Sequence, residues 1–282
     1  MKKTALVLEG GGLRGIYSAG VLDVLMEENI KVDCIIGVSA GALFGVNYCS
    51  KQKGRALRYN QKYGADKRYM GFHSLITTGN IMNKEFCFDT LVNELDPFDY
   101  DTFKNSKVDF YAVVTNLKTG KAEYKLVKDM RKEEDMEKLR ASGSMPCLSK
   151  PVKIGNDLYL DGAIGDSIPV LKAIEMGYEK VIVVTTRVDS YRMKHKRRPY
   201  AKVMYRKYPK FAEAFINRDK MYNNTLMEMN RLEDEGRILV IKPTRLVKIS
   251  RVEKDPNIMQ EQYDLGVSDT KSRLKDIKKY LK

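Results

Sequence analysis

The chain has few of the residues that most often build metal sites, disulfides and proton relays. Its 282 residues include two histidines, four cysteines and no tryptophan. The cysteines lie far apart, with no C-x-x-C pair and no histidine beside them: Cys34, Cys49, Cys87 and Cys147. We therefore predict buried, reduced thiols, no metal ion and no other cofactor.

Long apolar runs are also missing. The run Thr4–Leu8 that follows the two N-terminal lysines is cut by Glu9, and a secretory signal needs about seven to fifteen apolar residues. No window approaches the roughly 18 uninterrupted apolar residues of a transmembrane helix. Hydrophobic residues make up 43% and charged residues 31%, as in a globular protein. We expect a cytoplasmic protein.

Alternating strand and helix patterns indicate an α/β fold. Thr4–Leu8 is predicted as a buried strand, followed by a helix that ends near Asn29 and by a second buried strand, Val32–Val38. This β-α-β-α order is typical of a parallel sheet. Further strands are expected at Phe110–Thr115, Ala122–Val127, Leu158–Leu160, Val181–Thr185 and Arg237–Ile241, and further helices at Met130–Leu139, Lys210–Leu232 and Asn257–Leu281.

A candidate nucleophile lies where the second strand passes into a helix. Gly37-Val38-Ser39-Ala40-Gly41 fits the pattern G-x-S-x-G of a nucleophile elbow. The flanking glycines are needed because the serine backbone is strained and a neighbouring Cβ would collide with the strand and helix that it joins. A plain glycine-rich turn with a capping serine is the alternative interpretation.

The first strand ends in a glycine-rich loop, Gly10-Gly11-Gly12-Leu13-Arg14-Gly15. The loop also fits the dinucleotide fingerprint G-x-G-x-x-G, and Asp33 lies 18 residues beyond Gly15. A ribose-binding acid belongs at the C-terminal end of the second strand, however, and Asp33 begins that strand. We therefore favour an oxyanion hole, in which backbone amides of the loop bind developing negative charge.

The serine needs a base to take its proton. His195 lies in the basic run Arg192–Arg198, and His73 has no motif around it, so a histidine-containing triad is disfavoured. Asp161-Gly162-Ala163 directly follows a predicted strand, and its glycine permits a tight turn that holds the carboxylate at the strand end. Asp161 is the preferred candidate.

Together these three motifs resemble, in the same order, the signatures of patatin-like phospholipases. The stretches Ala141–Pro146 and Asp166–Val170 flank the aspartate as in that family, and the resemblance covers about residues 4–186. It implies a three-layer α/β/α sandwich, a Ser39–Asp161 dyad, an oxyanion loop and hydrolysis of acyl esters, often of phospholipids. A non-catalytic lipid- or nucleic-acid-binding regulator, and an acyltransferase that uses the same dyad, remain as alternatives.

Positive charge is concentrated in the C-terminal third. Residues 1–186 hold 26 Lys+Arg and 24 Asp+Glu, whereas residues 187–282 hold 25 and 13, so +2 and +12 add to the net +14. We expect a catalytic domain over 4–186 and a basic helical extension over 187–282 that packs on it. The interleaved tyrosines and basic residues of 191–210 suit peripheral contact with an anionic membrane, although an ordinary solvated surface stays open. Nucleic acid is disfavoured because no binding motif is present.

Overall fold

Eight strands form one central sheet in the computed structural model of the chain, which describes residues 3–282. They are β1 (Thr4–Leu8), β2 (Cys34–Val38), β3 (Asp109–Asn116), β4 (Ala122–Val127), β5 (Val152–Ile154), β6 (Asp157–Asp161), β7 (Lys180–Val184) and β8 (Ile238–Ile241). Pairing follows the order β5-β6-β3-β2-β1-β7-β8, and β4 pairs with β3. The pairs among β3, β2, β1, β7 and β8 are parallel, and those of β4, β5 and β6 are antiparallel.

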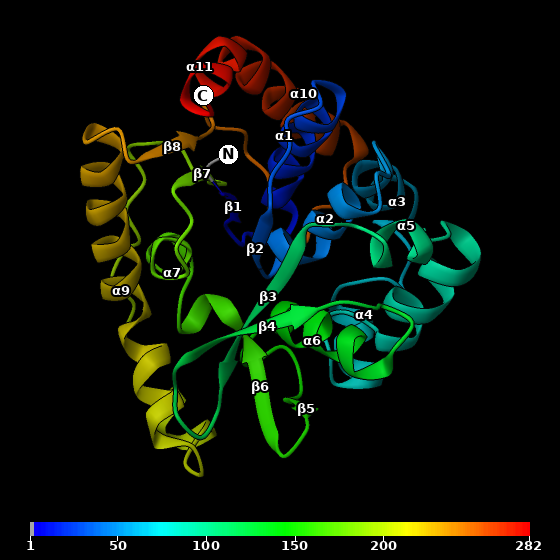
Figure 1. The fold of residues 1–282 in the computed structure, drawn as a ribbon. Helices are drawn as coiled ribbons and strands as arrows, with labels where there is room; N and C mark the ends of the chain where they lie inside the picture. Colours follow the sequence, from blue (N-terminus) through cyan, green and yellow to red (C-terminus); the bar gives the residue numbers. More distant parts are fainter. Residues whose placement is uncertain (1–2) are drawn as a thin grey trace.

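Helices cover both faces of this sheet (Figure 1). The α-helices are α1 (Ile16–Glu27), α2 (Ala40–Cys49), α3 (Arg55–Tyr63), α4 (Phe72–Thr78), α5 (Tyr100–Lys104), α6 (Glu133–Gly143), α7 (Val170–Glu175), α8 (Tyr200–Met204), α9 (Pro209–Asp234), α10 (Pro256–Ser272) and α11 (Leu274–Tyr280). Shorter or wider turns form η1 (Gly12–Gly15), η2 (Phe86–Leu95, a π-helix) and η3 (Gly162–Ile164).

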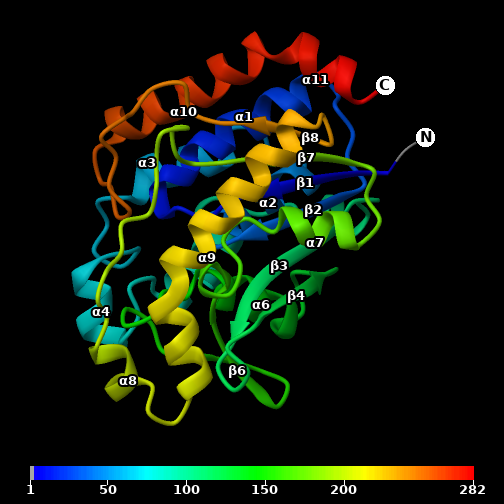
Figure 2. The same ribbon diagram turned by 90° about the vertical axis from the view of Figure 1, so that its left-hand side faces the viewer.

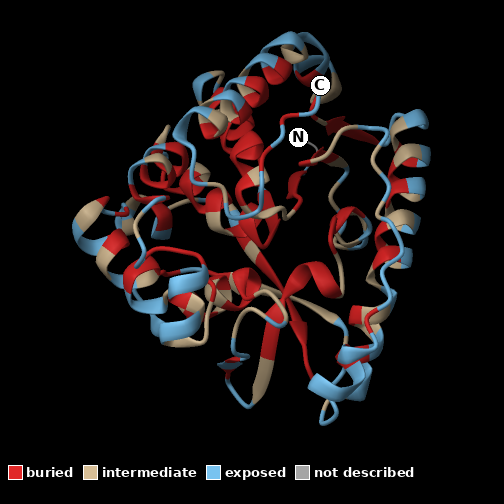
Figure 3. Ribbon diagram, turned by 180° about the vertical axis from the view of Figure 1, so that it is seen from behind, coloured by how far each residue is buried: buried red, intermediate tan, exposed pale blue. Residues whose placement is uncertain are grey.

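The alternation of side chains along β1 shows why the sheet needs two covering layers. Leu6 and Leu8 pack into a core built with α1, α2, α3 and α10, whereas Ala5 and Val7 pack into a second core with α7 and α9. All five β1 residues are buried, as expected for a parallel strand covered on both faces. Figure 3 shows the sheet as buried and the outer sides of the helices as exposed. The predicted three-layer α/β/α sandwich is confirmed.

The C-terminal third shares both cores with the rest of the chain. β8 pairs with β7 and extends the sheet, while α9 crosses one face of it (Figure 2). On the opposite face α10 packs along α1, and two glycines make the contact possible. A Cβ at Gly20 would lie 2.3 Å from the Tyr263 carbonyl oxygen, and one at Gly266 would lie 2.2 Å from that of Tyr17.

Two details differ from the sequence prediction. The last helix is two helices, α10 and α11, which meet at Arg273. Because the chain bends there, α11 reaches the sheet edge, where the Tyr280 hydroxyl donates to the Arg237 carbonyl at 2.8 Å. Cys147 is exposed and has φ 68°, so the prediction of four buried thiols is wrong for this residue. It lies in a turn outside the apolar elements that bury the other three.

In the part of the chain that the structure describes, no helix combines the length and apolar character needed to cross a bilayer.

The close crossing of α1 and α10 yields a test of how firmly the C-terminal third is held. Gly266→Ala places a methyl group against the Tyr17 carbonyl, so we expect a loss of about 1–3 kcal/mol in the free energy of unfolding. Ser268→Ala, at an exposed position of the same helix, is the control. Urea denaturation of both variants measures the effect. Equal midpoints for the two variants would show that the helices do not depend on this close contact.

Candidate active site

Ser39 occupies a strained turn between β2 and α2. Its φ of 53° and ψ of −121° lie in a region that residues with a side chain rarely adopt. The neighbouring glycines allow the turn to form against the first strand. A Cβ at Gly41 would lie 2.4 Å from the Leu8 carbonyl oxygen, and one at Gly37 would lie 2.7 Å from the Ala42 nitrogen. The glycines of the G-x-S-x-G motif are therefore required by close packing.

Asp161 reaches the serine because β2 and β6 use the same edge of β3. β4 pairs with Phe110–Thr115, a range that overlaps the β3 residues paired with β2 and also those paired with β6. β4 must therefore lie on the opposite edge of β3 from both of these strands. Along the shared edge, Val38 at the end of β2 pairs with Val113, and Asp161 at the end of β6 pairs with Val114. The two strands run toward each other and stop at neighbouring positions. The Ser39 Oγ donates to Asp161 Oδ2 at 2.8 Å.

The Asp161 carboxylate is buried, and both of its oxygens accept hydrogen bonds. Its Oδ1 accepts from the Ala163 amide at 2.9 Å, and its side chain is enclosed by the sheet and the η3 turn. Burial raises the pKa of Asp161 above its usual value, since a charged carboxylate loses solvation there. The hydrogen bonds from Ala163 and Ser39, and the positive charges of Arg218 and Arg251, oppose this rise.

The Asp-Gly-Ala turn fits tightly between β3 and α9. A Cβ at Gly162 would lie 2.2 Å from the Val113 carbonyl oxygen, so this position has room only for glycine. The Ala163 carbonyl accepts from Arg218 Nε at 2.7 Å, which ties the turn to the long C-terminal helix. Both residues after Asp161 thus hold the carboxylate in place.

The glycine-rich loop lies directly beside the serine. A Cβ at Gly10 would lie 2.8 Å from the Ser39 Cβ, and Gly12 has φ 60° with the Arg251 backbone packed against it. The Leu13 amide donates to the Arg251 carbonyl at 3.1 Å, so this amide is already engaged.

Several other amides near the serine are free to act as donors. Within residues 3–282, the backbone N–H groups of Gly11, Gly12 and Ala40 make no hydrogen bond to another group. The Ser39 amide, in contrast, donates to Ser142 Oγ at 2.9 Å. The remaining loop residues, Arg14 and Gly15, lie in the η1 turn, where Gly15 packs against Ala40 and Phe44.

Several residues that support this site were missed by the sequence analysis. Glu9 is buried beside the loop, where it accepts from the Thr186 amide at 2.6 Å and from the Tyr222 hydroxyl at 2.7 Å. The site motifs are also contacted by Ser142, Arg218 and Arg251. No sequence motif assigns these three residues a part in the site. Glu9 could have been noticed in the sequence, because it is a charged residue directly after a strand that is otherwise apolar. The roles of the other three residues become visible only in the tertiary structure.

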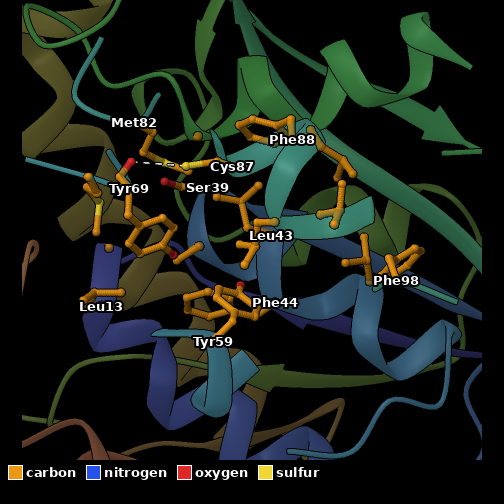
Figure 4. Close-up of a pocket in the computed structure, with 18 of the residues that line it drawn as sticks. Leu13, Ser39, Leu43, Phe44, Tyr59, Tyr69, Met82, Cys87, Phe88 and Phe98 are labelled. Carbon is orange, nitrogen blue, oxygen red and sulfur yellow. Dashed lines mark hydrogen bonds between the residues drawn. The ribbon is translucent and has the colours of Figure 1, made fainter. Parts of the chain in front are cut away.

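An apolar pocket opens at the serine. It is lined by side chains of η2, α2, α3 and α6 and by five methionines: Met70, Met82, Met130, Met136 and Met145. In Figure 4 the Ser39 oxygen lies near Tyr69, Met82 and Leu43, with the aromatic rings of Phe44, Phe88 and Phe98 around the same space. Unbranched methionine side chains adapt to the shape of an apolar ligand.

Neither histidine lies at this site. His195 Nδ1 lies 2.7 Å from Asp219 Oδ2 of α9, and His73 is exposed on α4. Asp33 is also remote from the glycine-rich loop, since its carboxylate accepts from the Thr4 amide at the start of β1, whereas the loop follows the end of that strand. The arrangement offers no ribose-binding acid at the loop.

The fold and the site together define a class: an α/β protein with a glycine-rich loop and a serine elbow after two parallel strands, and a carboxylate partner at the end of an antiparallel strand. A family model described as patatin-like phospholipase matches residues 6–174, which is more than half of the chain. The chain belongs to the patatin-like phospholipase family. A second model, described as a domain of unknown function (DUF6363), matches residues 208–282.

Individual relatives agree with this assignment. The chain is 30% identical over 190 residues to the uncharacterized protein YjjU of Escherichia coli, covering 65% of this chain and 52% of the relative. It is 27% identical to the lysophospholipase nte1 of Emericella nidulans, over 65% of this chain and 12% of that protein. It is also 27% identical to the probable lipid hydrolase 463L of Invertebrate iridescent virus 6, over 66% and 71%. The chain thus spans about half of the bacterial relative and a small part of the fungal one.

A solved structure is similar over most of the chain. The crystal structure of VipD from Legionella pneumophila aligns with a TM-score of 0.43 and 14% sequence identity, covering 96% of this chain and 67% of that one.

The buried carboxylate predicts a stability gain when its charge is removed. Because the pKa of Asp161 is raised in the folded state, its contribution favours folding at low pH and is lost as the pH rises through that raised value. Asp161→Asn keeps an acceptor for the Ala163 amide but carries no charge. At neutral pH we expect an unchanged or higher free energy of unfolding than in the wild type, and this advantage should shrink as the pH is lowered.

Urea denaturation at neutral and acidic pH measures this difference. Asp157→Asn, at a partly exposed position on the same strand, is the control and should show no such trend. A variant Asp161→Asn that is destabilised most at neutral pH would contradict the expectation.

Proposed function

We propose that the chain is a serine acyl hydrolase of lipid esters, with Ser39 as nucleophile and Asp161 as general base. The observation that carries the proposal is the 2.8 Å hydrogen bond between the strained serine and the buried carboxylate, at the end of an apolar pocket. Membership of the patatin-like phospholipase family supports the same chemistry.

In the proposed first step, Ser39 Oγ attacks the ester carbonyl carbon while its proton passes to Asp161 Oδ2. Collapse of the tetrahedral intermediate breaks the ester bond, and the proton on Asp161 goes to the departing alcohol. Water then attacks the carbonyl carbon of the acyl-serine ester and gives a proton to Asp161. As the bond from this carbon to Ser39 Oγ breaks, Asp161 returns that proton to Oγ, and the acid leaves. An aspartate is usually a weak base, so the burial that raises the pKa of Asp161 favours this role.

The amides of Gly11, Gly12 and Ala40 are the proposed oxyanion donors. They make no hydrogen bond within the described chain, and they come from the loop and the helix start that border the serine. A single donor of this kind typically lowers the barrier by about 3 kcal/mol. The dipole of α2, whose first residue is Ala40, adds positive potential at the same point.

Positive charge near the serine favours a substrate with an anionic headgroup, because Arg251 lines the pocket and Arg14 lies in the glycine-rich loop beside it. Arg14 has its Nε buried without a hydrogen-bond partner in the described chain, and burial and the nearby Arg187 and Arg251 lower the pKa of Arg14 to about 10. None of these three arginines forms an ion pair within residues 3–282. A phosphate group would compensate this charge, which supports a phospholipid or lysophospholipid over a neutral ester.

The nucleophile can be tested with a fluorophosphonate probe. We expect covalent labelling of the wild type and none of Ser39→Ala.

The identity of the base is tested by ester hydrolysis. Asp161→Asn should lower the rate of ester hydrolysis by about 10²- to 10⁴-fold, the usual contribution of a general base. The double variant His73→Ala/His195→Ala should keep its activity, because neither ring lies at the serine. If the double variant folds but lacks activity, a histidine takes part in the reaction and the two-residue mechanism is wrong.

The pocket predicts a dependence on acyl-chain length. Leu43 follows the nucleophile elbow on α2 and lines the pocket, so Leu43→Trp should fill space that a long chain needs. We expect kcat/KM to fall about tenfold or more for long-chain esters, the order of a few lost buried CH₂ contacts, and to change little for acetate esters. Leu246→Trp, at an exposed site, is the control. Equal losses for both ester classes would show that the acyl chain does not enter this pocket.

A further inference from the structure

Two short helices expose large apolar side chains to solvent. On α4, Phe72 is 75% and Ile76 is 69% exposed, and their spacing of four residues places them on one side of the helix. On α8, Val203 is 76%, Met204 is 54% and Tyr200 is 49% exposed. We call these five side chains the α4–α8 face.

The two helices lie close together although about 120 residues separate them. Gly79, directly after α4, and Met204 of α8 line the same surface hollow, together with Lys150. The Lys150 ammonium also donates to the carbonyl of Thr78, the last residue of α4, at 3.0 Å. Figure 2 shows α4 and α8 as neighbours at one corner of the molecule. The two helices therefore border one hollow of the molecular surface.

The two chain segments that carry this face are basic, although Thr78 at the end of α4 also borders a hollow lined by Glu85, Asp89, Glu133 and Glu137. Neither residues 67–84 nor residues 190–210 contain an aspartate or glutamate, and the second segment holds nine Lys and Arg. In the described chain, Lys150, Lys202 and Lys207 are exposed and form no ion pair. Apolar side chains beside ammonium groups that form no ion pair match a bilayer surface, in which anionic headgroups lie above an apolar interior.

The basic segment 191–210 contributes less of its own apolar surface than its sequence suggests. Tyr205 is buried against Phe211, and the ring of Tyr191 packs on Tyr222 of α9. Arg198 is also buried, beside Asp219. The segment therefore offers charge and the exposed side of α8, while α4 supplies Phe72 and Ile76.

Residues on both sides of α4 in the sequence line the pocket that holds Ser39. Met70 and Met82, on either side of the helix, pair as an antiparallel bridge, and the Gly71 amide donates to the Ile81 carbonyl at 2.9 Å. Both methionines line the pocket. A bilayer that takes up the Phe72 and Ile76 side chains would therefore lie next to the cavity in which a lipid acyl chain would bind.

We propose that the α4–α8 face docks the protein on a bilayer that contains anionic lipids, with Phe72 and Ile76 as the apolar anchor and the surrounding lysines as headgroup contacts. Docking places the pocket at the lipid surface from which a substrate would enter. The proposal goes beyond the acyl hydrolase function and does not depend on it, because binding needs neither Ser39 nor Asp161.

Vesicle co-sedimentation with the Ser39→Ala protein tests docking separately from catalysis. The vesicles are phosphatidylcholine alone, or phosphatidylcholine mixed with phosphatidylglycerol. We expect binding to the mixed vesicles that weakens at high salt, and a loss of about tenfold or more in affinity for Phe72→Ser/Ile76→Ser. The control is Met227→Ser/Leu246→Ser, which changes two apolar residues of similar exposure, 68% and 66%, outside the face. Circular dichroism shows whether each variant is folded.

Activity measurements on the protein with an intact serine extend the test. With Phe72→Ser/Ile76→Ser, hydrolysis of vesicle lipids should fall while hydrolysis of a soluble short-chain ester stays at the wild-type rate. The proposal is overturned by equal vesicle binding of wild type and Phe72→Ser/Ile76→Ser, by an equal loss in the control pair, or by binding that ignores phosphatidylglycerol. Self-association in sedimentation velocity that the Phe72→Ser/Ile76→Ser change abolishes, without vesicle binding, would assign the face to a second copy of the chain instead.

Discussion

The hydroxyl of Ser39 and the carboxylate of Asp161 meet because two strands end head to head along one edge of β3. β2 runs parallel to β3 and stops beside Val113, and β6 runs antiparallel and stops beside Val114. The contact of 2.8 Å is thus fixed by the sheet and not by a flexible loop. In the proposed mechanism, strand pairing holds the nucleophile and its base in reacting geometry without a histidine between them.

This arrangement carries energetic costs that the neighbouring residues offset. The Ser39 backbone is strained, and a buried carboxylate loses solvation. The close fit of Gly41 on β1 and of Gly162 on β3 holds the strained turn and the carboxylate in position. The amide of Ala163, anchored in turn by Arg218, compensates part of the lost solvation. Substitution of either glycine therefore affects the site through the backbone.

Much of the fold and the centre of the site could be predicted from the sequence because they depend on local patterns. The buried runs at Thr4–Leu8 and before Ser39 become β1 and β2, and the glycines of the elbow lie where the turn needs them. The Asp161 side chain lies at a strand end, as its motif indicated.

What local patterns could not supply are contacts between distant segments. Arg251 comes to rest on Gly12 because a loop after β8 returns across the sheet, and no feature near position 251 signals this. Cys147 lies in an exposed turn, and the break at Arg273 accompanies the contact of α11 with the sheet edge. Such outcomes depend on tertiary packing, which overrides the local helix signal.

The charge asymmetry of the chain has a structural meaning at the site. Most of the net charge lies after residue 186, yet this part is not a separate module, since β8 belongs to the sheet and α9 and α10 cover its two faces. Two of its arginines, Arg218 and Arg251, lower the pKa of Asp161 against the effect of burial. The N-terminal part supplies the serine, the aspartate and the glycine-rich loop, and the C-terminal part supplies the positive potential around them. The electrostatics of the site are therefore a property of the whole chain, because the segment with the motifs is close to neutral by itself.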